Sequence, residues 1–143
     1  MASVQRLLMR AMGTLNILIY RASGGRVMGK VRGVPVLLLT VAGRRTGAEH
    51  TTPVSYIEDG GRFIVTGSAG GTPSDPQWFR NLRRADRAVV EVGRKRIDVT
   101  VAIAGPDEHG VLWEQLLARA PFFANYQAKV ERQIPMAILT PTH

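Results

Sequence analysis

A short basic loop holds the residue types most suited to binding an anion. The loop reads Gly43-Arg44-Arg45-Thr46-Gly47. Backbone N–H groups freed by such a turn form an anion-binding nest, and the guanidinium groups add charge and bidentate hydrogen bonds. The pattern is neither a Walker A loop nor a dinucleotide-binding fingerprint. His50 lies three residues beyond it and could donate to the same anion, while an ordinary basic turn is the alternative interpretation.

A second loop of small residues precedes an aromatic segment. It reads Ser68-Ala69-Gly70-Gly71, and Trp78, Phe79 and Asn81 follow. Small residues let a flat ring approach the backbone, and N–H groups near the start of the next helix can bind ring oxygens or phosphate. Trp78 and Asn81 are three apart and so share a helix face. Packing of the two aromatic residues in the core is the alternative.

A third candidate is the aromatic cluster in residues 121–127. Phe123 and Tyr126 are three residues apart and could wall an apolar substrate pocket. Core packing explains the same spacing equally well.

The composition excludes several kinds of chemistry. The chain has no cysteine, which removes disulfides, thiolate catalysis and cysteine-ligated metals. Its three histidines, His50, His109 and His143, form no pair with metal-ligand spacing, so we predict no metal site. No nucleophile-elbow motif supports a serine triad. We therefore expect the chemistry to come from a bound cofactor.

Positive charge is concentrated near the N-terminus. The chain of 143 residues has a net charge of +8, and its first 50 residues hold eight Lys or Arg against Glu49 alone. This excess predicts an anionic partner, such as nucleic acid, anionic lipid or a phosphorylated ligand. Nucleic acid is the least favoured, because the nine aromatic residues are not interleaved with the basic stretch 21–45.

The N-terminal segment predicts an amphipathic helix over residues 3–20. The apolar run is too short and too interrupted to cross a bilayer, and no signal-peptide cleavage site follows it. The helix either caps the core or lies on an anionic membrane surface, with Arg6, Arg10 and Arg21 facing lipid phosphates. Three glycines in residues 21–32 predict a mobile linker.

The remaining chain alternates short apolar runs with turn residues, which predicts a mainly β, α+β fold. Ser74 or Asp75 before Pro76 predicts a helix N-cap. Hairpin-linked strands favour a small β-barrel over a doubly wound sheet. We thus expect a helix and linker in residues 1–32 and a barrel domain in 33–143. The expected strands are 34–41, 51–57, 62–68, 88–92, 96–103 and 135–140, and the later helices are 76–84, 106–117 and 122–130.

Together these segments resemble the deazaflavin-dependent nitroreductase and quinone reductase family, which binds the 8-hydroxy-5-deazaflavin coenzyme known as factor 420. The resemblance covers about residues 34–141. Its motifs are Leu39-Thr40-Val41-Ala42-Gly43-Arg44-Arg45-Thr46-Gly47, Thr52-Pro53-Val54, Asp59-Gly60-Gly61-Arg62, Ser68-Ala69-Gly70-Gly71, Asp75-Pro76-Gln77-Trp78-Phe79-Arg80-Asn81-Leu82, Tyr126-Gln127 and Arg132-Gln133-Ile134-Pro135.

The resemblance implies a split β-barrel and a set of coenzyme contacts. Arg44, Arg45 and Thr46 would hold the phosphate and oligoglutamate tail of the coenzyme. His50 stands where the family often has a basic residue. Other implied coenzyme contacts, mostly to the ring, are Thr51, Thr52, Pro53, Ser55, Thr66, Gly67, Ser68, Ala69, Gln77, Trp78, Phe79, Asn81 and Phe123.

The implied reaction is hydride transfer from the reduced coenzyme to a quinone, an activated enone or a nitroaromatic. Ser55, Ser68 and Tyr126 are the candidate proton donors. Nitro-prodrug activators of the family carry tyrosines where this chain has Ser55, Ala120 and Phe123, so we expect a wider, more apolar pocket. The alternative is an FMN- or haem-binding split barrel. The expected location is the cytoplasm, with peripheral attachment to the inner face of the plasma membrane if the first helix binds lipid.

Overall fold

The computed structural model describes residues 2–69 and 71–142, and the side chains of the first helix from Gly13 onward. Gly70 and the expected side-chain roles of Arg6 and Arg10 lie outside the described part. The helices are α1 (Ala2–Ser23), α2 (Gln77–Arg83), α3 (Pro106–Arg119) and α4 (Phe123–Ala128). The strands are β1 (Lys30–Val31), β2 (Val34–Ala42), β3 (Glu49–Asp59), β4 (Arg62–Thr66), β5 (Arg87–Val92), β6 (Lys95–Ile103) and β7 (Met136–Pro141).

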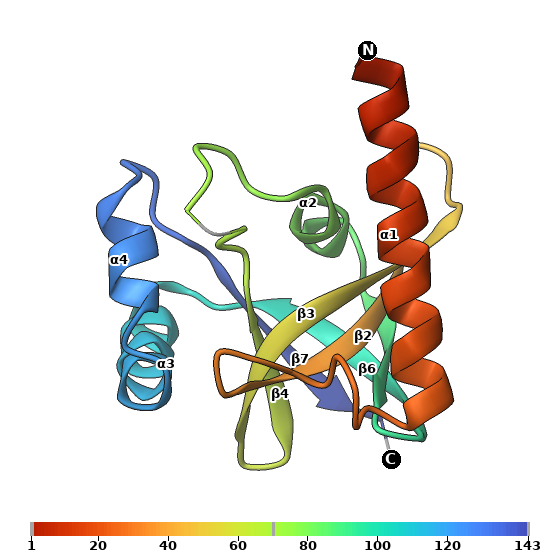
Figure 1. Ribbon diagram of the computed structural model, residues 1–143. Helices are drawn as coiled ribbons and strands as arrows, with labels where there is room; N and C mark the ends of the chain where they lie inside the picture. Colours follow the sequence, from red (N-terminus) through yellow and green to blue (C-terminus); the bar gives the residue numbers. More distant parts are fainter. Residues whose placement is uncertain (1, 70, 143) are drawn as a thin grey trace.

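Six of the strands close into an antiparallel barrel, which confirms the predicted fold. The strand order is β1-β2-β3-β4-β7-β6-β5, and a further pairing of β2 with β5 closes the ring. β1 is a seventh, two-residue strand outside the ring, and the sequence did not predict it. Figure 1 shows α1 along one side of the barrel, α3 and α4 together on the opposite side, and α2 over one end.

β2 is apolar along both faces because both of its faces are covered. Leu37 and Leu39 point into the barrel and are fully buried there. Leu38 points outward and is also fully buried, because it packs with Val36 against Tyr20 of α1. An alternating pattern would leave one face to solvent, whereas a continuous apolar run marks a strand covered on both faces. The covering helix thus accounts for the sequence of β2.

The opposite wall of the barrel has the same two-sided burial. Phe63 and Val65 of β4 fill the interior, while Ile64 faces outward against α3 and α4. These helices contribute Leu116 and Phe123 to that outer cluster. The aromatic segment around Phe123 is therefore packed against the barrel, as the core alternative predicts for this residue.

The C-terminal end of α1 is docked on the barrel. Tyr20 is only 2% exposed, and its hydroxyl lies 3.0 Å from the Val36 carbonyl and accepts a 3.0 Å hydrogen bond from the Gly93 N–H. Arg21 forms a bidentate ion pair with Glu91 of β5, at 2.9 and 2.8 Å. The Arg21 guanidinium is thus paired with a carboxylate of the barrel, and the expectation that it faces lipid phosphate stays a prediction.

Residues 21–32 form the end of α1, a helix cap and β1, so the predicted linker contains regular structure. α1 continues to Ser23 and ends in a Schellman-type cap, in which the Gly25 N–H donates to the Tyr20 carbonyl at 2.9 Å. Gly24, with φ of +65°, provides the left-handed conformation that this cap requires. β1 then pairs with β2. The glycines of this segment therefore serve a helix cap and turns.

The predicted side-chain cap of α2 is absent. Its N-cap is Pro76, and neither Ser74 nor Asp75 caps the helix through a side-chain hydrogen bond. The Asp75 carboxylate instead binds Arg132 at 2.7 Å and Arg83 at 3.1 Å. Hydrogen bonds to two cationic groups are stronger than one to a backbone amide, so tertiary contacts override the local signal.

Candidate functional site

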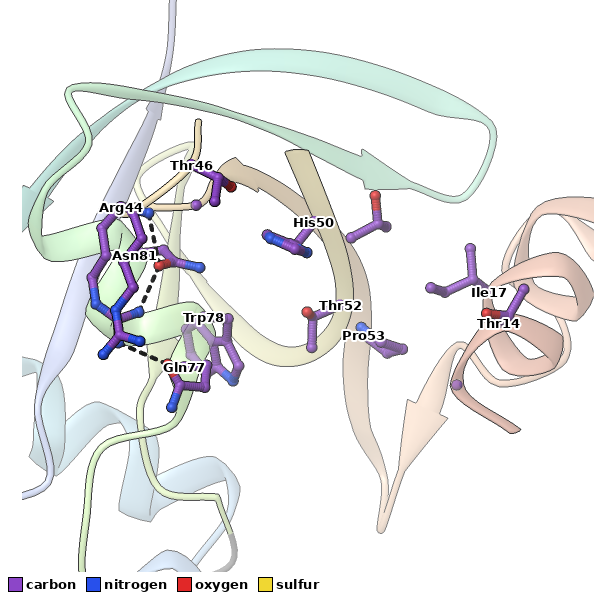
Figure 2. Close-up of a pocket in the computed structure, with 14 residues that line it drawn as sticks. Thr14, Ile17, Arg44, Thr46, His50, Thr52, Pro53, Gln77, Trp78 and Asn81 are labelled. Carbon is purple, nitrogen blue, oxygen red and sulfur yellow. Dashed lines mark hydrogen bonds between the residues drawn. The ribbon is translucent and has the colours of Figure 1, made fainter. Parts of the chain in front are cut away.

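A large cavity lies between α1, α2 and the loop that joins β2 to β3. Its volume is about 980 Å³, which suits a large organic ligand. Figure 2 shows the basic loop and α2 on one side, β3 in the middle and α1 on the other side. The lining residues are Gly13, Thr14, Ile17, Gly43, Arg44, Arg45, Thr46, His50, Thr51, Thr52, Pro53, Gln77, Trp78 and Asn81.

The basic loop is a tight turn stabilised by its own backbone. The Gly43 N–H donates to the Ala48 carbonyl at 2.7 Å, and the Gly47 N–H donates to the Gly43 carbonyl at 2.9 Å. Gly47 has φ of +77°, a conformation that side chains disfavour. Within the described part of the chain, no hydrogen bond uses the backbone N–H of Arg45 or Thr46. These two amides remain available to an anion, as the predicted nest requires.

Arg44 is held in place by two neutral amide side chains of α2. Its backbone N–H and its guanidinium both donate to Asn81 Oδ1, at 3.1 and 2.8 Å. A second guanidinium nitrogen donates to Gln77 Oε1 at 2.8 Å, as drawn in Figure 2. Asn81 is buried, so its geometry is fixed by packing. The amides orient the guanidinium and leave its positive charge uncompensated.

β3 and Trp78 form the neutral part of the cavity. Thr51 and Thr52 are half-buried and Pro53 is exposed, so this wall offers two hydroxyl groups and one apolar ring. Thr51 Oγ1 shares a 2.8 Å hydrogen bond with Thr40 Oγ1. The Trp78 ring lies edge to face against Phe79, with ring centroids 5.5 Å apart. A rigid indole beside an apolar strand edge is a suitable surface for a flat heterocycle.

Ten of the predicted coenzyme contacts line this cavity, but seven do not. Phe79 is fully buried in the barrel core, and Phe123 packs on the outer face of the barrel. Gly67 lies under the Phe79 ring, where an added Cβ would come within 2.9 Å of a ring carbon. The other predicted contacts outside the cavity lining are Ser55, Thr66, Ser68 and Ala69.

The three candidate proton donors also lie outside the lining of this cavity. Ser55 is half-buried on β3 and pairs with Val36 of β2. Ser68 is buried, and its carbonyl accepts hydrogen bonds from Gly71, Thr72 and Arg132. Tyr126 on α4 accepts a 3.2 Å hydrogen bond from Arg32, in the turn between β1 and β2.

α1 contributes a wall that the sequence did not predict. Gly13, Thr14 and Ile17 line the cavity. Figure 2 shows Thr14 and Ile17 across the cavity from Arg44 and Thr46 of the basic loop. The helical periodicity of residues 3–20 predicts an apolar face, but it does not indicate which surface that face covers. The position of α1 is set by the docking of Tyr20 against β2 and β5, which are distant in the sequence, so a local pattern could not predict it.

The comparisons with known proteins identify the family. A family profile described as F420H(2)-dependent quinone reductase matches residues 13–141. The chain belongs to this family. The match begins at Gly13, which lines the cavity. The predicted family and its deazaflavin-dependent enzyme class are thereby confirmed at the level of the family.

Individual relatives agree with this assignment. An F420H(2)-dependent quinone reductase of Mycobacterium tuberculosis (strain ATCC 25618 / H37Rv) is 34% identical over 126 residues, 85% of each chain. A solved F420-H2 dependent reductase is 29% identical with a TM-score of 0.67, over 73% of this chain and 93% of its own. A structure described as a domain-swapped dimer is 26% identical with a TM-score of 0.70, over 94% and 98% of the two chains.

The residues of this cavity fit the coenzyme of the quinone reductase family. Two guanidinium groups, a histidine and two free backbone amides lie on one side, and no carboxylate lines the cavity in the described part of the chain. This donor set suits a phosphodiester followed by carboxylates. Trp78, Pro53 and the threonines offer a flat, mostly neutral surface for the ring.

Proposed function

We propose that this chain transfers a hydride from the reduced deazaflavin coenzyme to an electrophilic acceptor: a quinone, an activated enone or a nitroaromatic. The coenzyme supplies the hydride chemistry, and the protein supplies position and a restricted environment. The observation that carries the proposal is the cavity in which Arg44, oriented by Asn81 and Gln77, faces a neutral wall of β3 and Trp78.

Each group in the cavity has a proposed role. Arg44, Arg45 and Thr46 bind the phosphate and the anionic tail, with His50 as a further donor. Trp78 and Pro53 hold the ring flat, and the hydroxyl groups of β3 bind its polar edge. Fixing the ring against a rigid barrel brings the reacting atoms close without loss of freedom at the moment of reaction.

A fluorescence titration with oxidised deazaflavin coenzyme, run beside FMN, tests the binding part of the proposal. We expect saturable binding of the deazaflavin, weakened by salt, and a large loss of affinity in Arg44→Ala plus Arg45→Ala. Arg83→Ala plus Arg84→Ala removes the same charge from the end of α2 and should retain most of the affinity. Preference for FMN would instead favour the flavin-binding alternative.

Tyr126 stays a proposed proton donor, although it lies on α4, outside the cavity lining and on the side of the barrel opposite α1. Arg32 donates to its oxygen, so the hydroxyl hydrogen of Tyr126 remains free to donate. We expect Tyr126→Phe to lower kcat by about tenfold or more while the Kd of the coenzyme stays unchanged. Equal turnover by the variant would remove Tyr126 from the mechanism. Ser55→Ala and Ser68→Ala test the two remaining candidates in the same assay.

We also propose that the protein is cytoplasmic and binds the inner face of the plasma membrane through α1. No helix in residues 2–69 and 71–142 has the length and apolarity needed to span a bilayer. Leu15 and Leu18 on α1 are 55% and 56% exposed. We expect flotation with anionic lipid vesicles, and loss of flotation in Leu15→Gln plus Leu18→Gln. Unchanged flotation of the variant would contradict this role of α1.

A further inference from the structure

We propose that Gly13 sets the width of the cavity where the electron acceptor enters, between α1 and β3, and so determines which acceptors are reduced. The inference rests on the proposed function and adds a specificity-determining residue to it. It is carried by the side chains of α1 that face the barrel and the cavity.

The side chains along this face of α1 become smaller toward the cavity. Tyr20 is buried against the barrel, and its hydroxyl binds the backbone of β2 and the turn after β5. Ile17 is half-buried and lies between the barrel and the cavity. Gly13, one turn further, has no side chain. Positions 13 and 17 lie on the same face of the helix, so the described part of this face is held at Tyr20 and leaves open space at Gly13.

Packing does not explain a glycine at position 13. A Cβ built on Gly13 would meet no atom within 4 Å, so no neighbour requires the absence of a side chain. Gly13 is also absent from the residues with positive φ, so its backbone conformation suits any residue. Glycine inside a helix lowers its stability relative to alanine. The structural effect of this glycine is the unfilled volume at the cavity wall.

The charge distribution assigns this end of the cavity to the acceptor. The cationic groups lie on the basic loop, on the side opposite α1 (Figure 2). In the part of α1 whose side chains the structure describes, the cavity wall consists of Gly13, Thr14 and Ile17, which carry no charge. An oligoanionic tail would bind the basic loop, whereas an uncharged quinone ring loses nothing by contacting the neutral wall. The exposed Leu15 and Leu18 of the same helix would accommodate an alkyl substituent outside the cavity.

The test is a graded series, Gly13→Ala, Gly13→Leu and Gly13→Phe, assayed with a small benzoquinone and with an alkyl-substituted naphthoquinone. We expect the ratio of kcat/KM for the naphthoquinone to that for the benzoquinone to fall with each increase in volume. Gly13→Phe should reach a decrease of about tenfold or more. The Kd of the oxidised coenzyme should change by less than about twofold across the series. Ala22→Phe adds bulk at an exposed position of the same helix outside the cavity lining and should leave the ratio unchanged.

Thermal unfolding of the variants distinguishes an effect of cavity width on the reaction from a loss of protein stability. Gly13→Ala should raise the Tm through its helix propensity while changing the ratio least. A constant ratio across the series would overturn the inference. A coenzyme Kd that rises with side-chain volume would also overturn it, because the α1 end would then hold coenzyme. Absence of coenzyme binding in the unmodified protein would instead overturn the proposed function itself.

Discussion

At the scale of single residues, the neutrality of Asn81 is central to the basic side of the cavity. A carboxylate at this position would hold Arg44 equally well but would cancel its charge. The amide oxygen of Asn81 accepts from both the backbone and the guanidinium of Arg44 without doing so. The buried amide therefore presents a fixed and uncompensated cation to an anionic ligand.

Two substitutions of Asn81 should separate stability from binding. Asn81→Asp keeps both hydrogen bonds, so we expect near-normal thermal stability with affinity for the coenzyme lowered by about tenfold. Asn81→Leu removes the acceptor from two donors and should cost about 1–3 kcal/mol of unfolding free energy. Urea unfolding and coenzyme titration measure the two effects. Equal coenzyme affinity in the unmodified protein and Asn81→Asp would show that the charge of Arg44 does not contribute to binding.

At the scale of elements, α1 is held on the barrel by one buried hydroxyl and one surface ion pair. The two contacts contribute unequally to the unfolding free energy. The hydroxyl of Tyr20 satisfies backbone groups that water cannot reach easily. The ion pair of Arg21 with Glu91 is open to solvent on the arginine side, since the Arg21 side chain is 45% exposed and that of Glu91 is 15% exposed. Solvent screening makes such exposed pairs weak.

We therefore expect two neighbouring substitutions to lower the unfolding free energy by different amounts. Tyr20→Phe should lower the unfolding free energy by about 1–3 kcal/mol, because buried backbone groups lose their partner. Arg21→Ala should lower it by less than about 1 kcal/mol, even though it removes a bidentate ion pair. Urea unfolding at moderate salt measures both. A larger loss in Arg21→Ala would mean that electrostatics, and not the tyrosine, anchors the helix.

The loop after β4 is a second element that depends on one side chain from far away in the sequence. Arg132 donates to the carbonyls of Gly67, Ser68 and Thr72 and binds the Asp75 carboxylate. Irregular backbone of this kind needs partners outside itself, because no ladder satisfies its carbonyls.

Loss of Arg132 should therefore loosen this loop more than the barrel. In Arg132→Ala we expect faster amide hydrogen exchange at Gly71 and Thr72, with exchange in β2 and β7 unchanged. Arg132→Lys keeps the charge but not the planar set of donors, and should be intermediate. Equal exchange in the unmodified protein and Arg132→Ala would indicate that the loop is held by other contacts.

At the scale of the whole molecule, the unfolding free energy of the barrel should vary with pH in the alkaline range because of Tyr56. Burial raises the pKa of Tyr56, and the nearby charge of Glu58 and the Tyr20 hydroxyl raise it further. The folded protein thus keeps this proton at a pH where the unfolded chain releases it. The contribution is complete below the ordinary tyrosine pKa of about 10 and is lost as the pH rises toward the folded pKa.

The unfolding free energy of the protein should therefore decrease above about pH 10, and less so in Tyr56→Phe. Urea unfolding at pH 8 and pH 10.5 measures the difference for both proteins. The variant keeps the ring that packs at 5.6 Å against Phe63, so the core is conserved. Parallel pH profiles would show that Tyr56 titrates equally in the folded and unfolded states.

The sequence alone determined the β-barrel, the basic loop and the family. Hairpin turns such as Glu58-Asp59-Gly60-Gly61 and the apolar runs of β2 and β7 are local signals, since turn residues and strand burial depend on near neighbours. The loop around Arg44 was also found locally, because glycines and arginines at close spacing suffice to form an anion-binding turn.

Only the tertiary structure decided how the remaining parts meet. The wall formed by Gly13, the fixing of Arg44 by Asn81 and the pairing of Asp75 with Arg132 each join residues more than 30 positions apart. Such contacts depend on barrel closure and helix docking, which periodicity in one segment cannot specify. The cavity therefore has residues that the sequence could name but a shape that only the packed fold defines.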